Sequence, residues 1–423
     1  LGKEEPLKKL VTSFVSSNLQ NNSMKKIFPL KGCVQQYVWG GDTFIPEFLS
    51  INSEGKPCAE YWMGAHDKAP SKISLEKDEI ALNYFIKSDP ESILGHKVNS
   101  EFGRLPYLFK VLDVKEMLSI QVHPNKSEAE KGFERENKLG IPFTAFNRNY
   151  KDDNHKPELM VALSEFWLLH GFRSQKSLES ILKASPELTF LIPIFHEKGY
   201  KGLYAFAMEL SDEEADAALR PLIDRILPLY KENGLPKSSP HYWAAKSLLH
   251  NKSNAPLDKG IFSIYFFNLL KLEKGDAVFQ AAGVPHAYLE GQTIELVANS
   301  DNVFRGGLTE KHVDIKELLK HVEYKETIPT IIQNKAVPNA KERRYECAST
   351  DFELSQITLN ENDFLDLSST TVEIFLVMEG NVEVASNDTL LHLKKGESFL
   401  TISDASFRLT SIEGANLFKA TTP

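Results

Sequence analysis

The sequence predicts a mainly β protein with a helical insertion, and three observations support this fold class. Turn-forming residues interrupt the stretch from Phe28 to Ile120 at short intervals, which is typical of a β-rich domain. Between Ser174 and Asn251 the apolar residues instead recur with helical spacing. A glycine turn, a strand, a second turn and the start of another strand occur twice, at Lys274–Glu290 and Lys395–Phe407. We therefore expect two β-barrel modules and one α-helical domain.

The predicted domains follow from the places where these patterns change along the 423 residues. A Ser/Asn-rich run before Met24 favours a leader or a loosely ordered segment at the start. The helical insertion divides the first barrel into two stretches of sequence. The predicted boundaries are 1–23 for the leader, 24–173 with 259–327 for the first barrel, 174–258 for the helical insertion and 328–423 for the second barrel.

Composition and charge exclude several classes of protein. Hydrophobic residues make up 42% and charged residues 25%, which is ordinary for a globular chain and excludes a disordered or fibrous protein. The net charge of −9 argues against a surface that binds nucleic acid or an anionic membrane. Ile261–Leu270, the longest apolar stretch, is about half the length that crosses a bilayer. The three cysteines lie far apart without a CxxC spacing, which favours a reducing, cytoplasmic setting.

One strand of the first barrel carries a row of polar side chains. Pro106–His123 predicts two strands joined near Asp113–Glu116. In the second strand apolar residues alternate with Ser119, Gln121 and His123, so these three side chains share one face. That face is a candidate for polar chemistry.

Three polar residues predict the starts of helices. Ser127, with a glutamate three positions later, caps a helix that reaches about residue 139. Ser211 caps a helix of the insertion, in which Pro221 and Pro228 are expected to kink or split the chain. Asp314 caps a helix that runs to about residue 322. The insertion should pack on the β core, and strands are expected to resume after it at Ile261–Leu270, Ala277–Gln280 and Thr293–Val297.

Four polar residues form a candidate metal site. Gln121 and His123 are two residues apart on one strand, so both side chains project from the same face. Glu158 follows a proline, which favours the start or the edge of a strand, and His286 follows the turn at Gly283. Two imidazoles, one carboxylate and one amide oxygen suit Zn²⁺ and leave a position for a substrate oxygen or water. The histidines without such support are interpreted as structural or surface groups; they are His155, His170, His241 and His250.

The repeated pattern resembles the second half of the cupin motif. In the first copy Gly275 and Gly283 occupy the glycine positions, and His286 occupies the histidine position. In the second copy Asp404 replaces the turn glycine and Phe407 replaces the histidine. The resemblance implies a bicupin, that is, two jelly-roll β-barrel modules, of which only the first has a metal site.

Several segments also resemble the signature segments of type I phosphomannose isomerases, in that family's order. The resemblance spans roughly Lys26–Val322 and is weak beyond Ile328, and the co-occurrence of several segments makes it more specific than any one motif. The matching segments are Tyr37–Gly41, Glu60–His66, Leu108–Val111, Ser119–Asn125, Lys156–Leu159, Gly283–Tyr288 and Asp301–Leu308.

The resemblance implies a zinc-dependent aldose–ketose isomerase that interconverts mannose 6-phosphate and fructose 6-phosphate by ring opening and proton transfer through an enediolate. It puts one Zn²⁺ per chain on Gln121, His123, Glu158 and His286. The partner is then a small phosphorylated hexose, with no nucleic acid and no membrane, and we expect a cytoplasmic monomer.

Two residues are candidates for the base that moves the proton. Glu295 alternates with Ile294 and Leu296, which puts it on the polar face of its strand. Lys156 lies two residues before Glu158, and a nearby metal cation would favour the neutral, basic form of its amine. Both remain candidates.

Further residues are candidates for the substrate pocket. Arg305, beside Gly306 and Gly307, has a guanidinium suited to phosphate or planar oxygens. Lys110 is either a cation near the substrate or a lysine that guards a sheet edge. Asp301 either assists ring opening or forms an Asx turn. The remaining candidates for substrate binding are Ser119, Tyr288 and Trp39, of which Trp39 either stacks on the sugar or fills the core.

Two other functions are compatible with parts of the same sequence. An iron-dependent cupin oxygenase would share the barrel, but such sites combine histidines with one carboxylate, and Gln121 argues against it. A non-catalytic sugar-binding bicupin is the second alternative, and it gives no reason for Lys156, Glu295 and Arg305 to converge on the ion.

Overall fold

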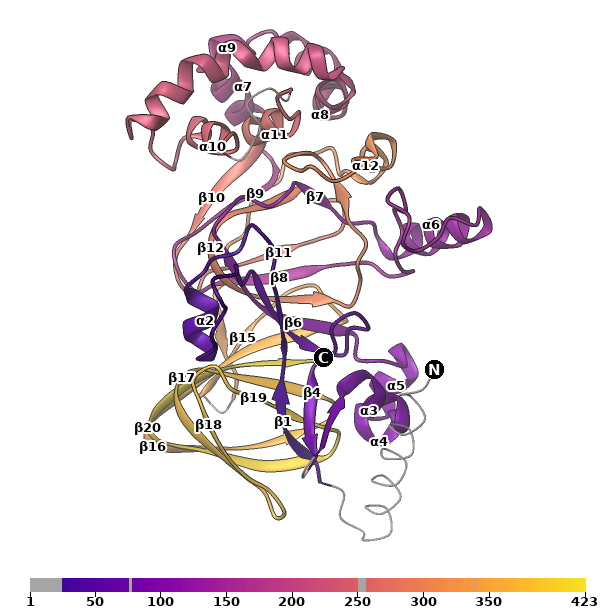
Figure 1. The fold of residues 1–423 in the computed structure, drawn as a ribbon, viewed down its shortest axis with the longest axis vertical. Coiled ribbons are helices and arrows are strands. Elements are labelled where there is room, and N and C mark those ends of the chain that lie inside the picture. The colour runs from indigo at the N-terminus through magenta and orange to yellow at the C-terminus, as the bar shows by residue number, and fades with distance from the viewer. Residues whose placement is uncertain (1–24, 76–77, 250–255, 339) are drawn as a thin grey trace. The chain divides into compact units, whose positions relative to one another are not determined.

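The computed structural model describes residues 25–75, 78–249, 256–338 and 340–423 (Figure 1). The predicted leader at 1–23 and His250 lie outside these residues. By their contacts the described residues divide into two compact units. Unit 1 lies within Leu1–Asp113, Thr293–Asn299 and Ile332–Pro423, and unit 2 comprises Val114–Gln292 and Ser300–Ile331.

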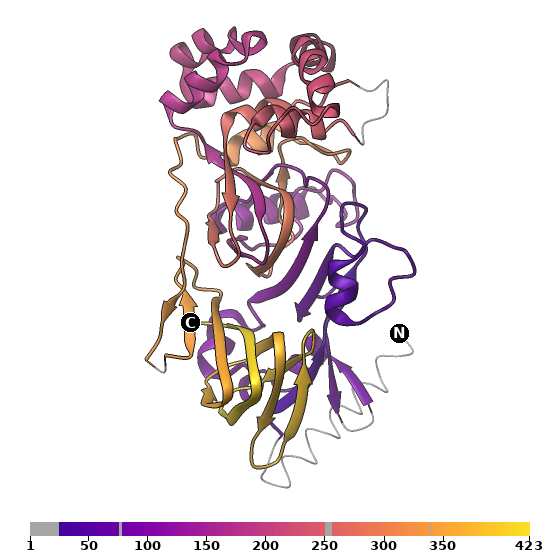
Figure 2. The same cartoon turned by 90° about the vertical axis from the view of Figure 1, so that its left-hand side faces the viewer.

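The larger sheet of unit 1 combines strands from both ends of the chain. Figure 2 shows its C-terminal strands, in yellow, as a curved sheet. Ile27 in the first strand of the chain pairs with Thr401 near its end. Across the sheet the order is β14 (Lys335–Ala336), β15 (Glu342–Tyr345), β16 (Glu353–Ser369), β20 (Ala405–Thr421), β17 (Glu373–Ala385), β19 (Ser398–Thr401), β1 (Ile27–Lys31), β4 (Lys72–Leu75) and β5 (Asp78–Ala81), with β18 (Leu390–Lys394) paired to β17.

Unit 1 also contains a second group of strands and four short helices. The buried phenol of Tyr107 ties this group to the larger sheet, since its oxygen lies 3.1 Å from the carbonyl oxygen of Val372 and 3.0 Å from that of Ala420. The elements are β2 (Cys33–Gln35), β3 (Glu60–Gly64), β6 (Tyr107–Val114), residues 293–298 of β12 (His286–Ala298), α2 (Phe44–Leu49), α3 (Leu82–Ser88), α4 (Pro90–Leu94) and α5 (His96–Phe102).

This division by contacts differs from the predicted domains, whose boundaries stay a prediction. The sequence pattern assigns residues 25–113 to the first barrel, whereas their contacts group them with residues 332–423. The reason is the antiparallel pairing of β1 with β19, which no local sequence pattern predicts.

The two copies of the repeated pattern share the same backbone turns. Gly275 and Gly283 in the first copy have φ values of 94° and 80°, and Gly396 and Asp404 in the second have 86° and 58°. All four residues therefore adopt the left-handed conformation that glycine tolerates best and aspartate tolerates better than most residues. The predicted correspondence of the two copies is confirmed at these turns.

The second copy places an aromatic side chain where the first has a histidine. Phe407 is 5% exposed, and its ring packs edge-on against Phe375 and Phe399 at centroid distances of 5.7 and 6.0 Å. Hydrophobic packing thus occupies the position that corresponds to His286.

The strands of unit 2 form the sheet that carries the candidate site. Its order is β10 (Phe267–Leu272), β9 (Phe166–Phe172), the start of β12, β7 (Gln121–Val122) and β13 (Phe304–Arg305), and β8 (Glu158–Ala162) pairs with β11 (Ala277–Gln280) and β12. The predicted strand at 118–123 is shorter than expected, because Ile120 bonds instead to the turn at Gly306 and Gly307.

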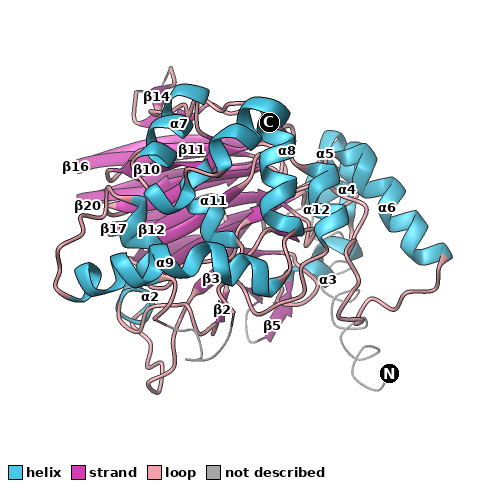
Figure 3. Ribbon diagram, turned by 90° about the horizontal axis from the view of Figure 1, so that it is seen from above, coloured by secondary structure: helices cyan, strands magenta, loops and turns pink. Residues whose placement is uncertain are grey.

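The predicted helical insertion is present, and the helices of unit 2 are drawn in cyan in Figure 3. Ser211 caps its helix with both halves of the capping box, as predicted, but the helix is not split at Pro221 or Pro228, because its apolar face is buried in the core. None of the helices within the described ranges is long and apolar enough to cross a membrane. The helices of unit 2 are α6 (Lys126–Lys138), α7 (Gln175–Lys183), α8 (Leu191–Glu209), α9 (Asp212–Lys231), α10 (Pro240–Lys246), α11 (Gly260–Phe266) and α12 (Ile315–His321), with a 3₁₀ turn at Pro186–Leu188.

Two predictions of local structure are wrong. The run Ile261–Leu270 begins as the helix α11 and becomes a strand only at Phe267. All seven residues of α11 are buried, and a run that is apolar on every side has no period that would identify a helix. The N-cap of α6 is Asn125, not Ser127, because the Asn125 side chain accepts the bond from the backbone of Glu128. Asp314 caps α12 as predicted.

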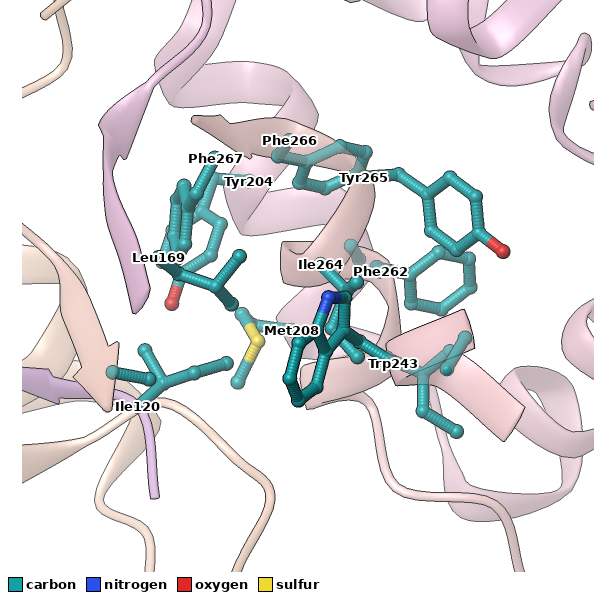
Figure 4. Packing of buried hydrophobic residues seen from close by; sticks show 14 of the residues in the cluster. Ile120, Leu169, Tyr204, Met208, Trp243, Phe262, Ile264, Tyr265, Phe266 and Phe267 are labelled. Atoms are coloured by element: carbon teal, nitrogen blue, oxygen red, sulfur yellow. The ribbon is translucent and has the colours of Figure 1, made fainter. Parts of the chain in front are cut away.

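The helices of the insertion cover one face of the unit 2 sheet. Figure 4 shows Ile120 and Leu169 from this face beside Met208 and Trp243 of the helices. Along the strands, Val122, Leu169, Ala287 and Phe304 belong to this hydrophobic cluster. Because side chains alternate along a strand, their neighbours Gln121, His170, His286 and Arg305 lie on the opposite face. The alternation therefore separates a packing face from a polar face.

Candidate metal centre

Three buried residues of unit 2 bring metal-ligating atoms together. His123 follows β7, Glu158 begins β8 and His286 begins β12, and their ligand atoms all lie within 4.8 Å of one another. The Nε2 atoms of His123 and His286 each lie 3.2 Å from an oxygen of the Glu158 carboxylate. Two imidazole nitrogens and a carboxylate are a donor set typical of zinc.

The strand register explains why these side chains converge. Arg305 pairs with Gln121, Gln121 pairs with His286, and His286 pairs with His170, so the four side chains form one row across the polar face. The predicted fourth ligand, Gln121, is therefore a direct cross-strand neighbour of His286. Its role as a ligand stays a prediction.

Both histidines are held with Nε2 free to bind a metal. The Nδ1 atom of His123 lies 2.8 Å from the carbonyl oxygen of Asn302, and that of His286 lies 2.9 Å from the carbonyl oxygen of Val284. Because a carbonyl only accepts, each ring carries a proton on Nδ1. Neither buried Nε2 atom has a hydrogen-bond partner among the described residues, and burial lowers the pKa of His123 to about 4. The donor atoms therefore fit a divalent ion, which would satisfy both lone pairs.

Glu158 is ready to bind as a carboxylate. Burial alone would raise its pKa, but the Lys156 ammonium and His123 hold the pKa of Glu158 well below its ordinary value. The Lys156 Nζ atom lies 2.7 Å from one oxygen of the carboxylate. Lys156, one of the two predicted bases, is thus in direct contact with a candidate ligand of the metal.

The turn before His286 is tied to the cluster through the backbone. The N–H of Gly283 donates to the carbonyl oxygen of His123 at 2.9 Å. A side chain at Gly283 would approach the backbone oxygen of His321 to 3.1 Å and would have to adopt a φ of 80°. The predicted glycine is therefore required by this turn.

The other predicted residues of unit 2 lie close to the cluster in the fold. Arg305 is half-buried, its guanidinium makes no ion pair or hydrogen bond within the described part of the chain, and its pKa is lowered by burial. Ser119 precedes β7 by two residues. Tyr288 follows His286 on β12, with 6.4 Å between the two ring centroids. Asp301 donates its backbone N–H to the Asp152 carboxylate at 2.7 Å, so this loop is held by a partner outside the predicted Asx turn.

Three predicted residues belong to unit 1, whereas the cluster belongs to unit 2. The Nζ atom of Lys110 lies 2.9 Å from the carboxylate of Glu295 and 3.7 Å from that of Glu60. Lys110 is 6% exposed and β6 lies between β3 and β12, so the alternative of a lysine guarding a sheet edge is wrong. Trp39 is half-buried and stacks on Tyr37 at 5.8 Å.

Two residues on the polar face of unit 2 were missed by the sequence analysis. His170, interpreted there as a structural or surface group, lies opposite His286, and Gln280 lies opposite Glu158. The two side chains are joined by a 2.6 Å hydrogen bond, and burial lowers the pKa of His170 to about 4. The one available signal was the position of Gln280 at the end of the strand in the first repeated pattern.

Comparison with known proteins gives consistent results. Residues 27–175 match the family model for the catalytic domain of type I phosphomannose isomerase. The mannose-6-phosphate isomerase of Shigella flexneri is 36% identical over 88% of this chain and 94% of the relative, and that of Bos taurus is 34% identical over 94% and 98%. A crystal structure of mannose 6-phosphate isomerase from Salmonella typhimurium, bound to substrate (F6P) and zinc, matches with a TM-score of 0.83 and 31% identity over 94% of this chain and all of that one.

These likenesses extend over nearly the whole of both chains, which a shared local motif would not produce. They confirm the predicted fold class, a mainly β bicupin with helices. The chain belongs to the type I phosphomannose isomerase family.

Proposed function

We propose that the protein is a zinc-dependent isomerase that interconverts mannose 6-phosphate and fructose 6-phosphate. The observation that carries the proposal is the pair of buried Nε2 atoms on His123 and His286, which face one carboxylate and have no hydrogen-bond partner among the described residues. The names of the relatives and the zinc and F6P in a solved neighbour support it.

The proposed ligands of the metal are Gln121, His123, Glu158 and His286, with one Zn²⁺ per chain. When bound, the ion supplies a Lewis acid that stabilises negative charge on the sugar oxygens by several kcal/mol. The Nδ1 atoms of His123 and His286 bond to backbone carbonyls, and these bonds keep both Nε2 atoms directed at the proposed metal position.

The reaction moves two protons, one between neighbouring carbons and one between their oxygens. In the aldose-to-ketose direction a base removes the proton from C2 and returns it to C1, while the C2 hydroxyl loses its proton and the C1 oxygen gains one. Lys156 is supported as this base by its 2.7 Å contact with Glu158, and Glu295 by its buried position 2.9 Å from the Lys110 ammonium. Asp301 is proposed to assist ring opening.

Substrate binding is proposed to depend on side chains that present positive charge or donors. Arg305 is the strongest candidate, because a half-buried guanidinium without an acidic partner among the described residues favours an anionic ligand. The other residues proposed to bind substrate are Ser119, Tyr288, Lys110 and Trp39.

The cellular setting is part of the same proposal. Three free cysteines favour the reducing cytoplasm. The protein is proposed to act as a monomer. We also propose that residues 24–173 with 259–327 form the catalytic domain, 174–258 the helical insertion and 328–423 the second cupin module.

The direct test is a coupled assay with mannose 6-phosphate before and after treatment with a chelator. We expect activity to disappear with the metal and to return on addition of Zn²⁺, because the proposed reaction needs the Lewis acidity of the ion on the sugar oxygens. Metal analysis should find about one zinc per chain. Activity that survives complete removal of metal, or oxygen uptake that depends on iron, would refute the proposal.

A second test distinguishes the two candidate bases. Lys156→Gln and Glu295→Gln are compared for kcat, for zinc content and for exchange of the substrate C2 hydrogen with solvent. The variant that lacks the base should lose about 10²–10⁴-fold in kcat and in exchange, with zinc retained, because the transferred proton then has no acceptor. The other variant serves as its control and should retain exchange. If both variants exchange at the wild-type rate, neither residue is the base.

A further inference from the structure

The loop that supports His123 is built on one buried amide. Asn302 is 0% exposed, and its backbone oxygen accepts the bond from Nδ1 of His123. Its side chain does not reach the metal candidates. Instead, it bonds entirely to the segment 151–154, which leads into Lys156 and Glu158.

Every hydrogen-bonding position of the Asn302 side chain is used. Its Oδ1 atom accepts from the backbone N–H groups of Lys151 at 2.7 Å and Asp152 at 3.3 Å. Its Nδ2 atom donates to the carbonyl oxygens of Asp152 at 2.8 Å and Asn154 at 2.9 Å, and to the Asp152 carboxylate at 3.1 Å. A buried amide with all of its bonds made holds two segments in one relative position.

The Asp152 carboxylate completes the connection from the other side. It accepts from the hydroxyl of Ser300 and from the backbone N–H of Asp301, both at 2.7 Å. The residues 300–302 are therefore fixed to 151–154 by both side chains. The first segment leads into β13 and Arg305, and the second into β8 and Glu158.

We propose that Asn302 and Asp152 form a positioning clamp that fixes the tautomer and orientation of His123 for metal binding. Neither residue is a ligand. The clamp acts by placing the Asn302 carbonyl where it accepts a hydrogen bond from the Nδ1–H of His123, which leaves Nε2 without a proton and facing Glu158. The inference deepens the proposed function, since it rests on the proposed zinc site.

The test is Zn²⁺ affinity, measured by competition with a chromophoric chelator, for the wild type and for Asn302→Ala. The variant keeps the backbone carbonyl but loses the bonds that hold it in place. We expect zinc to bind about 10–100-fold more weakly, the range typical for loss of a group that orients a ligand. Saturating Zn²⁺ should restore most of the isomerase activity, because no group that contacts the substrate has been removed.

Asn268→Ala is the matched control. The Asn268 amide is also a hub in unit 2, since it donates to the carbonyl oxygens of His170, Gly171, Phe172 and Thr327, but none of these residues is a proposed ligand or bonds to the Nδ1 atom of one. Both variants should lower the thermal stability of the metal-free protein, whereas zinc affinity should fall only in Asn302→Ala. Equal loss of zinc affinity in the two variants would mean that general destabilisation is the cause, and the clamp would be rejected.

A second substitution keeps the test decisive if Asn302→Ala does not fold. Asp152 is half-buried and outside the hydrophobic core, and Asp152→Ala should weaken zinc binding in the same direction, with Asp152→Asn closer to the wild type because it keeps the shape and one acceptor oxygen. Wild-type zinc affinity in Asp152→Ala would overturn the clamp and leave the proposed function unaffected. A wild-type protein that binds no zinc would instead overturn the proposed function.

Discussion

Replacing His286 by alanine is expected to release the metal and abolish isomerase activity together. His286 supplies one of only two imidazole nitrogens in the cluster, and its Nε2 atom lies 3.2 Å from Glu158. Without it the proposed site keeps one imidazole, one carboxylate and one amide, a set that holds zinc poorly at neutral pH. We expect zinc content to fall from about one per chain to near zero.

The loss should be specific to the cluster. Zinc content by elemental analysis and kcat by the coupled assay are measured on the same preparations of His286→Ala. The matched control is His241→Ala, which removes a histidine of unit 2 whose Nδ1 atom contacts the Tyr265 hydroxyl at 2.8 Å, away from the cluster. That variant should keep its zinc. Retention of zinc in His286→Ala would remove His286 from the ligands and leave the proposed site without a basis.

Much of this site could be predicted because its residues carry local signals. The alternation around Gln121 and His123 placed both on a polar face, and the structure has that face opposite a hydrophobic cluster. The turn glycine before His286 was readable because Gly283 adopts a φ of 80° that few other residues accept. These are properties of single strands and turns, which depend on neighbours in sequence.

The residues that could not be predicted depend on contacts between distant segments. His170 is no different in sequence from the histidines interpreted as surface groups, and its place opposite His286 follows from the register of β9 and β12. Asn302 contributes through its backbone oxygen, which every residue possesses. Residue type alone therefore identifies ligands better than it identifies the groups that hold them.

The same limit applies to the fold. The short strand β1 looks like any edge of the first barrel in sequence, yet Ile27 pairs with Thr401 near the end of the chain. The helix α11 was mistaken for a strand because all of its side chains are buried and no polar face marks its period. In both cases tertiary contacts decide what local patterns leave ambiguous.

Replacing Arg305 by alanine is expected to reduce turnover by orders of magnitude and to leave zinc in place. Arg305 stands beside Gln121 in the strand register, on the polar face of the sheet, and none of the described acidic residues pairs with its guanidinium. A positive group kept half-buried without a counter-ion costs solvation energy, and an anionic substrate or the charge that develops during proton transfer would offset that cost.

The size and the selectivity of the effect test this interpretation. Removal of one group that stabilises developing charge typically costs about 10²–10³ in kcat, and loss of a phosphate contact would raise KM as well. Arg305→Lys is the conservative control: it keeps the charge but loses the planar, two-pronged donor, so activity should lie between the wild type and the alanine variant. Zinc content should be equal in all three proteins, because Arg305 lies next to a proposed ligand without being one. Wild-type turnover in Arg305→Ala would exclude the residue from the reaction, and loss of zinc in that variant would show that its neighbour Gln121 depends on it instead.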